Sequence, residues 1–238
     1  MRRLLAPMLC LAALLTAVST VSTVSTGPAG AIVRGTVDWS AHPSVGALIK
    51  PNGRPYCSGV LVANRKPGKV FLTSAHCLGP RGNGTRVRVT FGATTASGPI
   101  YTGIYHVMPG YVQATFANDI AVVVFTSVPR LRAVYIDDGD TWLGPGAIVT
   151  TVGYGIPSTG IRKWATEIVR RSSSRWLFLT AGSGNSCNID SGGPDLVQPD
   201  ADDTTGPEVV ALTDQGTCSW DQDFRVTGVA VRHFVDNP

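Results

Sequence analysis

Short runs of alternating or β-branched residues recur between Val45 and Val229, and Gly, Pro, Asn and Asp interrupt nearly all of them. Runs of this kind are typical of strands joined by turns. A weak helical period appears only over Val231–Asp236. The pattern predicts an all-β fold, either a sandwich or barrels. The expected strands are Val45–Ile49, Ser58–Val62, Val70–Thr73, Val87–Phe91, Ile100–Met108, Ile120–Phe125, Ala147–Gly153, Ala165–Arg170, Trp176–Thr180, Val209–Thr213 and Phe224–Val229.

Composition agrees with a folded chain that has a sizeable core. Of the 238 residues, 43% are hydrophobic and 15% are charged, which excludes disorder on compositional grounds. The 27 Gly and 16 Pro suit a fold with many turns. A turn-rich stretch near Pro129–Asp140 divides the chain into two halves of similar size.

The first residues predict a secretory signal peptide that spans residues 1–31. The basic pair Arg2-Arg3 precedes the apolar run Leu4–Val18, and Ala29–Ala31 matches an A-x-A cleavage site. The alternative is an N-terminal membrane anchor, but Pro7 interrupts the run, which is shorter than the roughly 20 residues of a membrane span. We therefore expect a secreted, extracellular protein with no membrane association after the signal is removed.

Net charge argues against a nucleic-acid partner. The whole chain has a formal net charge of +4, and removal of residues 1–31 takes away two arginines and no acidic residue, which leaves +2. No dense basic run remains, and Arg81, Arg86 and Arg88 are interpreted as a solvated face. No repeat or patch demands an oligomer, so a monomer is expected.

The cysteines agree with an oxidising compartment. Of five cysteines, Cys10 lies in the signal, and Cys57, Cys77, Cys187 and Cys218 remain. Four cysteines allow three connectivities, of which the sequence-local one pairs Cys57 with Cys77 and Cys187 with Cys218. A zinc site is the alternative, although the sequence lacks C-x-x-C spacing.

Two short segments contain the residue types that a nucleophilic serine needs. A serine hydroxyl becomes a good nucleophile only when a neighbouring base takes its proton. Asp190–Pro194 reads DSGGP, and the glycines after Ser191 permit a tight turn and a close approach of substrate. Thr73–Cys77 reads TSAHC and presents His76 beside a cysteine whose disulfide would hold the backbone. Taken alone, these segments are also compatible with an ordinary turn and a structural histidine.

A third segment supplies a carboxylate. Asp119 opens the apolar run Asn118–Val122, where it can accept the imidazole N–H and stabilise the imidazolium, although alone it is also compatible with a strand-edge turn. The three residues occur in the order His76, Asp119, Ser191. An α/β-hydrolase would run Ser, Asp, His and a subtilisin-like enzyme Asp, His, Ser, and no G-x-S-x-G motif surrounds the serine.

This order, with all three local contexts, resembles the chymotrypsin/trypsin family of serine proteases over nearly the whole mature chain. The resemblance implies two antiparallel six-stranded β-barrels, residues 32–131 and 132–238, with the active site in the cleft between them and a short C-terminal helix. It also implies Ser191 as nucleophile, His76 as general base and Asp119 as the orienting acid, with no metal or organic cofactor.

Two further matches concern activation and the oxyanion hole. Ile32–Gly35 resembles the family's mature N-terminus, whose ammonium group pairs with the Asp before the nucleophile, here Asp190. We therefore expect signal cleavage itself to free the activating N-terminus at Ile32, with no separate propeptide. The resemblance implies an oxyanion hole at the N–H groups of Ile189 and Ser191. The family has Gly at the first of these positions, where a β-branched residue with positive φ would be strained.

The specificity pocket also departs from the pattern of trypsin. Asn185 stands where trypsin-like cleavage after Lys or Arg relies on an Asp, so a strong preference for basic residues is not expected. Thr213, Asp214 and Gln215 match the strand with which substrates of the family pair. Asp214 would restore some acidity to the cleft, and Gln215 would narrow the pocket.

The main expectation is a secreted serine endopeptidase that hydrolyses protein or peptide substrates through an acyl-enzyme on Ser191. Two alternatives stay open. One is a catalytically impaired homologue that binds proteins or peptides in the same cleft, which Ile189, Asn185 and Gln215 favour. The other is a secreted esterase, which acyl chemistry also permits.

Overall fold

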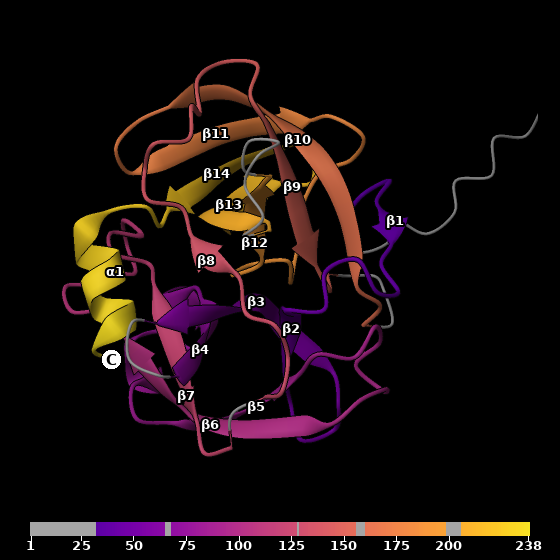
Figure 1. The fold of residues 1–238 in the computed structure, drawn as a ribbon, viewed down its shortest axis with the longest axis vertical. Coiled ribbons are helices and arrows are strands. Elements are labelled where there is room, and N and C mark those ends of the chain that lie inside the picture. The colour runs from indigo at the N-terminus through magenta and orange to yellow at the C-terminus, as the bar shows by residue number, and fades with distance from the viewer. Residues whose placement is uncertain (1–31, 65–67, 128, 156–159, 199–205) are drawn as a thin grey trace, which may run out of the picture.

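Strands form two closed antiparallel barrels, seen one above the other in the computed structural model of Figure 1. The predicted signal peptide, residues 1–31, lies outside the described residues. Within the described part of the chain, no helix has both the length and the apolarity that a membrane span requires. The described residues are 32–64, 68–127, 129–155, 160–198 and 206–238.

The first barrel is built from the N-terminal half of the chain. Its strand order is β2-β3-β4-β7-β6-β5, and the pairing of β5 with β2 closes it. Two short 3₁₀ turns, η1 (Ala75–Cys77) and η2 (Pro80–Gly82), connect β4 to β5. The strands are β2 (Val45–Ile49), β3 (Pro55–Asn64), β4 (Gly68–Thr73), β5 (Arg86–Thr90), β6 (Ile100–Val107) and β7 (Ala121–Phe125).

The second barrel has the order β9-β10-β11-β14-β13-β12, closed by the pairing of β12 with β9. Its strands are β9 (Ile148–Gly153), β10 (Lys163–Ser172), β11 (Trp176–Ala181), β12 (Pro194–Val197), β13 (Glu208–Thr217) and β14 (Trp220–Arg225). Two short strands join it: β1 (Thr36–Val37) pairs with β10, and β8 (Tyr135–Ile136) runs parallel to β13. Helix α1 (Val229–Asp236) ends the chain. The prediction of two six-stranded antiparallel barrels and a short C-terminal helix is confirmed.

The alternation of side chains along the strands explains where the apolar residues go. Successive residues of a strand point to opposite faces. On β4, Phe71 points into the first barrel, where its ring contacts Phe91 edge-on with centroids 5.7 Å apart. Val70 and Leu72 point the other way, into a cluster that both barrels share. Strand β4 therefore packs into two clusters, one inside the first barrel and one that both barrels share.

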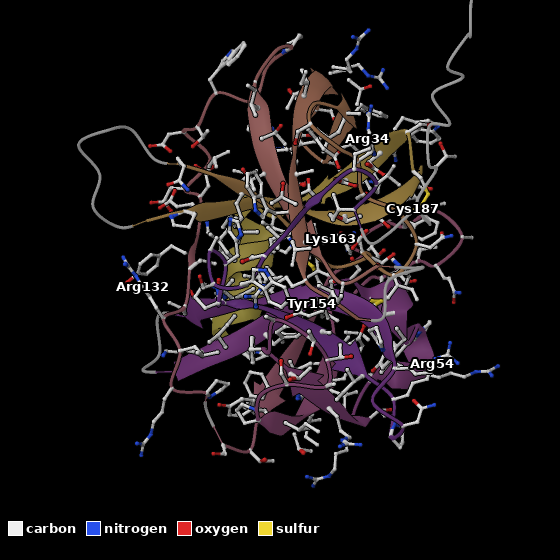
Figure 2. The ribbon with its side chains drawn as sticks, turned by 90° about the vertical axis from the view of Figure 1, so that its right-hand side faces the viewer. Arg34, Arg54, Arg132, Tyr154, Lys163 and Cys187 are labelled. Carbon is white, nitrogen blue, oxygen red and sulfur yellow. A yellow bond between two sulfur atoms is a disulfide. The ribbon has the colours of Figure 1, made fainter. Side chains whose placement is uncertain are left out.

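The shared cluster holds the two barrels together. It contains Leu72 of the first barrel and Leu212 of the second, together with Phe234 of α1. Tyr154, which follows β9, lies at the junction of the barrels (Figure 2). Its buried hydroxyl donates to the carbonyl of Gly92 in the first barrel at 2.6 Å. The junction matters because residues from both barrels meet there in the candidate site.

The last predicted strand is misplaced. Phe224–Val229 was expected, but the structure has β14 over Trp220–Arg225, and Val229 begins α1. The inward positions of β14 are Asp221 and Asp223, which are buried. Because a hydrophobicity pattern treats acidic residues as exposed, it moves the strand toward the apolar residues that follow. The same reason explains why β12, which carries a buried Asp, was not predicted.

Both predicted disulfides are confirmed. Cys57 on β3 is bonded to Cys77 in η1, and Cys187 is bonded to Cys218 in the second barrel. A cysteine in a disulfide has no thiolate to offer a metal, so the alternative of a zinc site built on these residues is wrong.

Candidate active site

The pairing of β4 with β7 brings His76 to Asp119. Thr73, the last residue of β4, is opposite Ala121, the first residue of β7. His76 follows in η1, and Asp119 comes just before β7. The fully buried Asp119 carboxylate accepts the backbone N–H of His76 at 2.7 Å, and its other oxygen lies 2.6 Å from Nδ1 of the imidazole. These two contacts fix both the position and the orientation of the ring.

Ser191 reaches the same place from the second barrel. Its carbonyl accepts the N–H of Ser58 at 2.9 Å and lies 3.9 Å from Sγ of Cys77, the neighbour of His76. Gly192 has φ of 80°, and a Cβ there would lie 2.2 Å from Oγ1 of Thr73. Only glycine therefore allows this turn to pack against the segment that carries the imidazole.

Ser191 Oγ and His76 are not joined by a hydrogen bond among the described residues. Contacts of this kind often shorten only when the reacting groups are aligned on a substrate. The described geometry thus brings together the three residues singled out from the sequence, with the imidazole–carboxylate contact already formed.

A second carboxylate reaches the imidazole. Oδ1 of Asp214, on β13, lies 3.5 Å from Nδ1 of His76. Burial lowers the pKa of His76, but the hydrogen bonds and charges of Asp119 and Asp214 outweigh it and raise the pKa to about 9. Burial raises the pKa of Asp214 to about 8, opposed by the hydrogen bond of His76 and reinforced by Asp119. The three groups therefore share charge and protons as one cluster.

The backbone before Ser191 forms a β-turn. The N–H of Asp190 donates to the carbonyl of Cys187 at 3.0 Å, and Ile189, at the third position of the turn, has φ of 73°. A positive φ at this position normally requires Gly, and a β-branched residue is strained there. Among the described residues, neither the N–H of Ile189 nor that of Ser191 donates to a protein acceptor. Both expected oxyanion donors are thus available, at the expense of a strained isoleucine.

Asp190 is fully buried and turned away from the nucleophile. Its carboxylate accepts the backbone N–H groups of Gly155 at 2.7 Å, Cys187 at 2.9 Å and Ile32 at 3.2 Å. Burial raises its pKa to about 6, although these hydrogen bonds and the charge of Lys163 lower it. Ile32, itself fully buried, is therefore already seated beside the carboxylate that the resemblance assigns to it.

A cavity of about 170 Å³ adjoins Ser191. Thr213 and Gln215, two of the residues that the resemblance assigns to the specificity pocket, line it, and so does Asp221 of β14. Asn185 is buried behind the wall, where its Nδ2 donates to Oδ2 of Asp221. The cavity therefore carries a carboxylate that sequence reasoning missed.

These features occur in a chain whose residues 33–226 match the trypsin family model. The chain belongs to the trypsin family. A curated relative named trypsin, from Saccharopolyspora erythraea, is 26% identical over 193 residues, which cover 75% of this chain and 81% of the relative. Membership supports a trypsin-like serine protease that acts on protein or peptide substrates.

Two groups of side chains in this trypsin-family chain have ligand atoms spaced closely enough for a metal ion, among the described residues. One consists of His76 with Cys57 and Cys77, and its two sulfur atoms form a disulfide. The other consists of His76, Asp119 and Asp214, whose imidazole is held by hydrogen bonds to carboxylates. The prediction that no metal or cofactor takes part stays a prediction.

The sequence does not predict where three residues of the trypsin-family site lie. The sequence places Asp214 on the substrate-binding strand and Tyr105 on a strand, and it gives no sign that Asp214 reaches the imidazole or that Tyr105 or Asp221 contacts the site. The hydroxyl of Tyr105 donates to the carbonyl of Ser74 at 2.6 Å, directly beneath the turn that carries His76. Of these positions, only that of Asp221 has a signal in the sequence. Asp221 and Asp223 stand at alternate positions of β14, which is the spacing of residues on one face of a strand.

Proposed function

We propose that this chain is a secreted serine endopeptidase that hydrolyses peptide bonds through an acyl-enzyme on Ser191. The observation that carries the proposal is the 2.6 Å contact between the imidazole of His76 and the buried carboxylate of Asp119, at the same junction as Ser191. The family match supports the same reaction class.

In the proposed mechanism, Ser191 Oγ attacks the scissile carbonyl while Nε2 of His76 takes its proton. Asp119 keeps the remaining imidazole proton on Nδ1 and stabilises the imidazolium. The N–H groups of Ile189 and Ser191 donate to the oxyanion, where loss of one donor typically costs about 2.7–4 kcal/mol. His76 then protonates the leaving amine, and water attacks the acyl-enzyme by the reverse path.

The test is covalent labelling of the secreted protein with a serine-directed phosphonylating reagent. We expect a mass gain at Ser191, loss of labelling in His76→Ala, and cleavage of casein by the unmodified protein. If a folded, correctly processed sample is neither labelled nor cleaves casein, the proposal fails. The impaired, peptide-binding homologue would then be the better account, and the strained Ile189 and the high pKa of His76 favour it.

We further propose that cleavage after Ala31 activates the enzyme. The new ammonium group of Ile32 would neutralise the buried carboxylate of Asp190, and either charge alone is costly to bury. Its support is the present contact of 3.2 Å between the Ile32 nitrogen and Oδ2 of Asp190. N-terminal sequencing of the secreted protein tests this step: a start at Ile32 is expected, and a start well upstream would require a second cleavage.

The cavity beside Ser191 supports a preference for basic substrate residues, which the uncharged Asn185 alone does not predict. Asp214 and Asp221 line it, and it has no basic lining residue among the described ones. We propose that it accepts a basic side chain on the acyl side of the scissile bond. Asp221→Asn should lower kcat/KM for a Lys substrate relative to a Leu substrate by roughly 10-fold or more, because a charge-assisted hydrogen bond is lost. The control is Asp140→Asn, on the exposed surface.

A further inference from the structure

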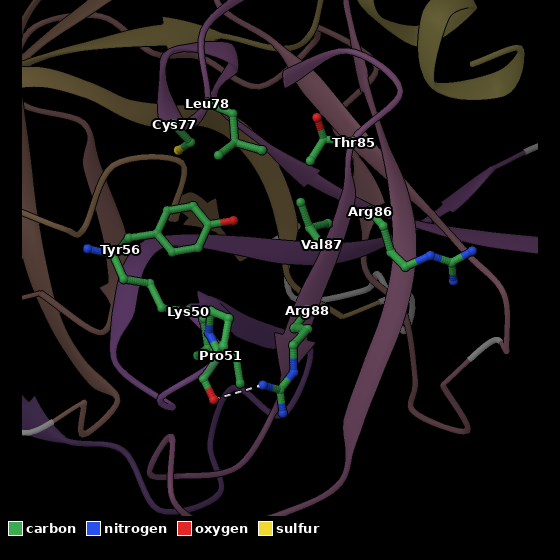
Figure 3. A pocket seen from close by; sticks show the side chains of 10 residues that line it. Lys50, Pro51, Tyr56, Cys77, Leu78, Thr85, Arg86, Val87 and Arg88 are labelled. Carbon is green, nitrogen blue, oxygen red and sulfur yellow. Dashed lines mark hydrogen bonds between the residues drawn. The ribbon is translucent and has the colours of Figure 1, made fainter. Parts of the chain in front are cut away.

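A second cavity lies on the first barrel, beyond the residues assigned to catalysis. Its volume is about 480 Å³, and residues of β2, β3, β5 and η1 line it. Figure 3 shows the ring of Tyr56 reaching into it toward Val87, with Leu78 and Cys77 on the wall above. The walls are therefore largely apolar and can hold a side chain of similar character.

The rim of this cavity is positively charged. Lys50, Arg86 and Arg88 belong to its lining, and the lining contains no Asp or Glu among the described residues. Nη1 of Arg88 donates to the carbonyl of Pro51 at 3.0 Å, which holds this guanidinium at the rim, as the dashed line in Figure 3 shows. Of the three arginines that the sequence assigns to a solvated face, Arg86 and Arg88 also border this cavity, and Arg86 remains exposed.

The cavity begins one residue from the proposed general base. Cys77 follows His76, and its Sγ lies 3.9 Å from the carbonyl of Ser191. Cys77 is bonded to Cys57, whose neighbour in the chain, Tyr56, also lines the cavity. Burial raises the pKa of Tyr56 to about 12, so its hydroxyl remains a hydrogen-bond donor.

The two cavities lie on opposite barrels. Only residues of the second barrel line the cavity beside Ser191, and only residues of the first barrel line the larger one. When the acyl-side residue of a peptide occupies the cavity beside Ser191, the leaving amine must lie near His76, because His76 protonates that amine. The chain beyond the scissile bond is thereby directed to the first barrel.

We propose that this cavity binds the leaving-group segment of polypeptide substrates and selects there an acidic side chain next to an apolar one. The inference rests on the proposed peptidase function. Charge complementarity with the rim provides the selection, and the apolar wall accepts the neighbouring residue. Because the rim is exposed to solvent, its effect should weaken as salt rises.

The experiment uses the mature protein and peptides with one common acyl half. Their leaving halves carry Glu-Leu, Lys-Leu or Gln-Leu. We expect kcat/KM for the Glu peptide to exceed that for the Lys peptide by about 5- to 10-fold at low salt, as exposed charge pairs allow. The variant Arg86→Glu/Arg88→Glu should reverse the order. The control Arg170→Glu, an exposed position on β10, should not.

A substrate with a small leaving group and no residue beyond the scissile bond separates the two proposals. Its hydrolysis should be equal in the unmodified protein and in Arg86→Glu/Arg88→Glu. If it is hydrolysed but the Glu and Lys peptides are cleaved equally, or if their preference survives the double variant, the inference is overturned.

A binding measurement keeps the inference testable even if catalysis fails. Ser191→Ala, titrated with the fluorescent Glu-Leu peptide, should bind it more tightly than the Lys-Leu peptide. The same titration in the background of Arg86→Glu/Arg88→Glu should lose that difference. Equal binding of the two peptides to Ser191→Ala would contradict the proposed cavity function, whatever the enzyme activity.

Discussion

Asp214 gives the proposed general base an unusual electrostatic environment. A second carboxylate 3.5 Å from Nδ1 adds to Asp119, and together they raise the pKa of His76 to about 9 against the effect of burial. Only the neutral imidazole accepts a proton from serine. Activity should therefore rise with pH through an apparent pKa set by this cluster.

Asp214→Asn should move the acidic limb of the pH–rate profile to lower pH. The substitution keeps the shape of the side chain and removes one of the charges that raise the pKa of His76. More imidazole is then neutral at pH 7, so kcat/KM at that pH should increase several-fold. The measurement is the pH dependence of acylation by a small ester, with Asp140→Asn as the exposed control. An unchanged acidic limb would show that Asp214 does not act on the imidazole.

Ile189→Gly should stabilise the protein. A non-glycine residue in the left-handed region costs about 1–3 kcal/mol, and glycine removes this strain while it loses some entropy on folding. We expect the free energy of unfolding to rise by about 1 kcal/mol. Ser191 should retain labelling by the phosphonylating reagent, because the turn is unchanged. Urea denaturation provides the measurement. Ile189→Ala should gain less, and a loss of stability in Ile189→Gly would contradict the strain at φ of 73°.

At the scale of elements, a hydrogen bond from β6 supports the short turn that carries His76. Tyr105 is fully buried, and its hydroxyl donates to the carbonyls of Ser74 at 2.6 Å and Ala75 at 3.2 Å. The turn η1 is too short to hold its own position, since a 3₁₀ turn makes few internal hydrogen bonds. Its placement therefore depends on β6 and on the contact with Asp119.

Tyr105→Phe should lower the free energy of unfolding by about 1–2 kcal/mol, the usual cost of removing one partner of a buried hydrogen bond. The rate of labelling at Ser191 should also fall, because His76 becomes less well positioned. Chemical denaturation and labelling kinetics measure the two effects. Tyr101→Phe on the same strand is the matched control, since its ring packs among aromatic side chains. Equal effects of the two variants would exclude a special role for the Tyr105 hydroxyl.

At the scale of the whole molecule, the second barrel encloses an unusual number of acidic side chains. Asp195 and Asp223 are fully buried, and burial raises the pKa of both carboxyl groups, with the charge of Asp195 raising that of Asp223 further. Burial and the charge of Asp221 raise the pKa of Glu167 to about 10, and burial raises that of Asp221 to about 7. Oγ1 of Thr151 donates to Asp195 at 2.6 Å.

The sign of these shifts predicts how stability depends on pH. The folded protein retains protons that the unfolded chain releases above its carboxyl pKa of about 4. Each retained proton lowers the free energy of unfolding by up to about 1.4 kcal/mol per pH unit as pH rises. His76, whose pKa is raised, contributes in the same direction as pH rises toward about 9. Stability should therefore be greatest in mild acid and fall steadily toward alkaline pH.

Thermal unfolding between pH 4 and pH 10 measures this dependence. Asp223→Asn removes one titrating group and can still accept the N–H of Asp214, which lies 3.1 Å from Oδ1. The decline of Tm with pH should be shallower in this variant than in the exposed control Asp140→Asn. A Tm that increases from pH 5 to pH 9 would contradict the raised pKa values of these buried carboxyl groups.

Residue patterns alone predicted the all-β class, most strands and the sequence-local disulfides, because alternation and turn residues act over short distances. They also singled out His76, Asp119 and Ser191 as candidate catalytic residues, because the three lie in segments that occur in the order His, Asp, Ser; their catalytic roles stay a prediction. The resemblance supplied the two barrels, and the trypsin family match and the strand pairing confirm the family and the fold.

Only the tertiary structure decided what surrounds these residues. Strand pairing over long sequence separations turned Asp214 toward the imidazole and put Asp221 into the cavity beside Ser191. The same strand pairing buries Asp223, and because this buried residue is acidic, a hydrophobicity pattern does not predict β14. A carboxylate has no local preference that reveals its partner, because its proton, its charge and its neighbours are set by residues from other strands.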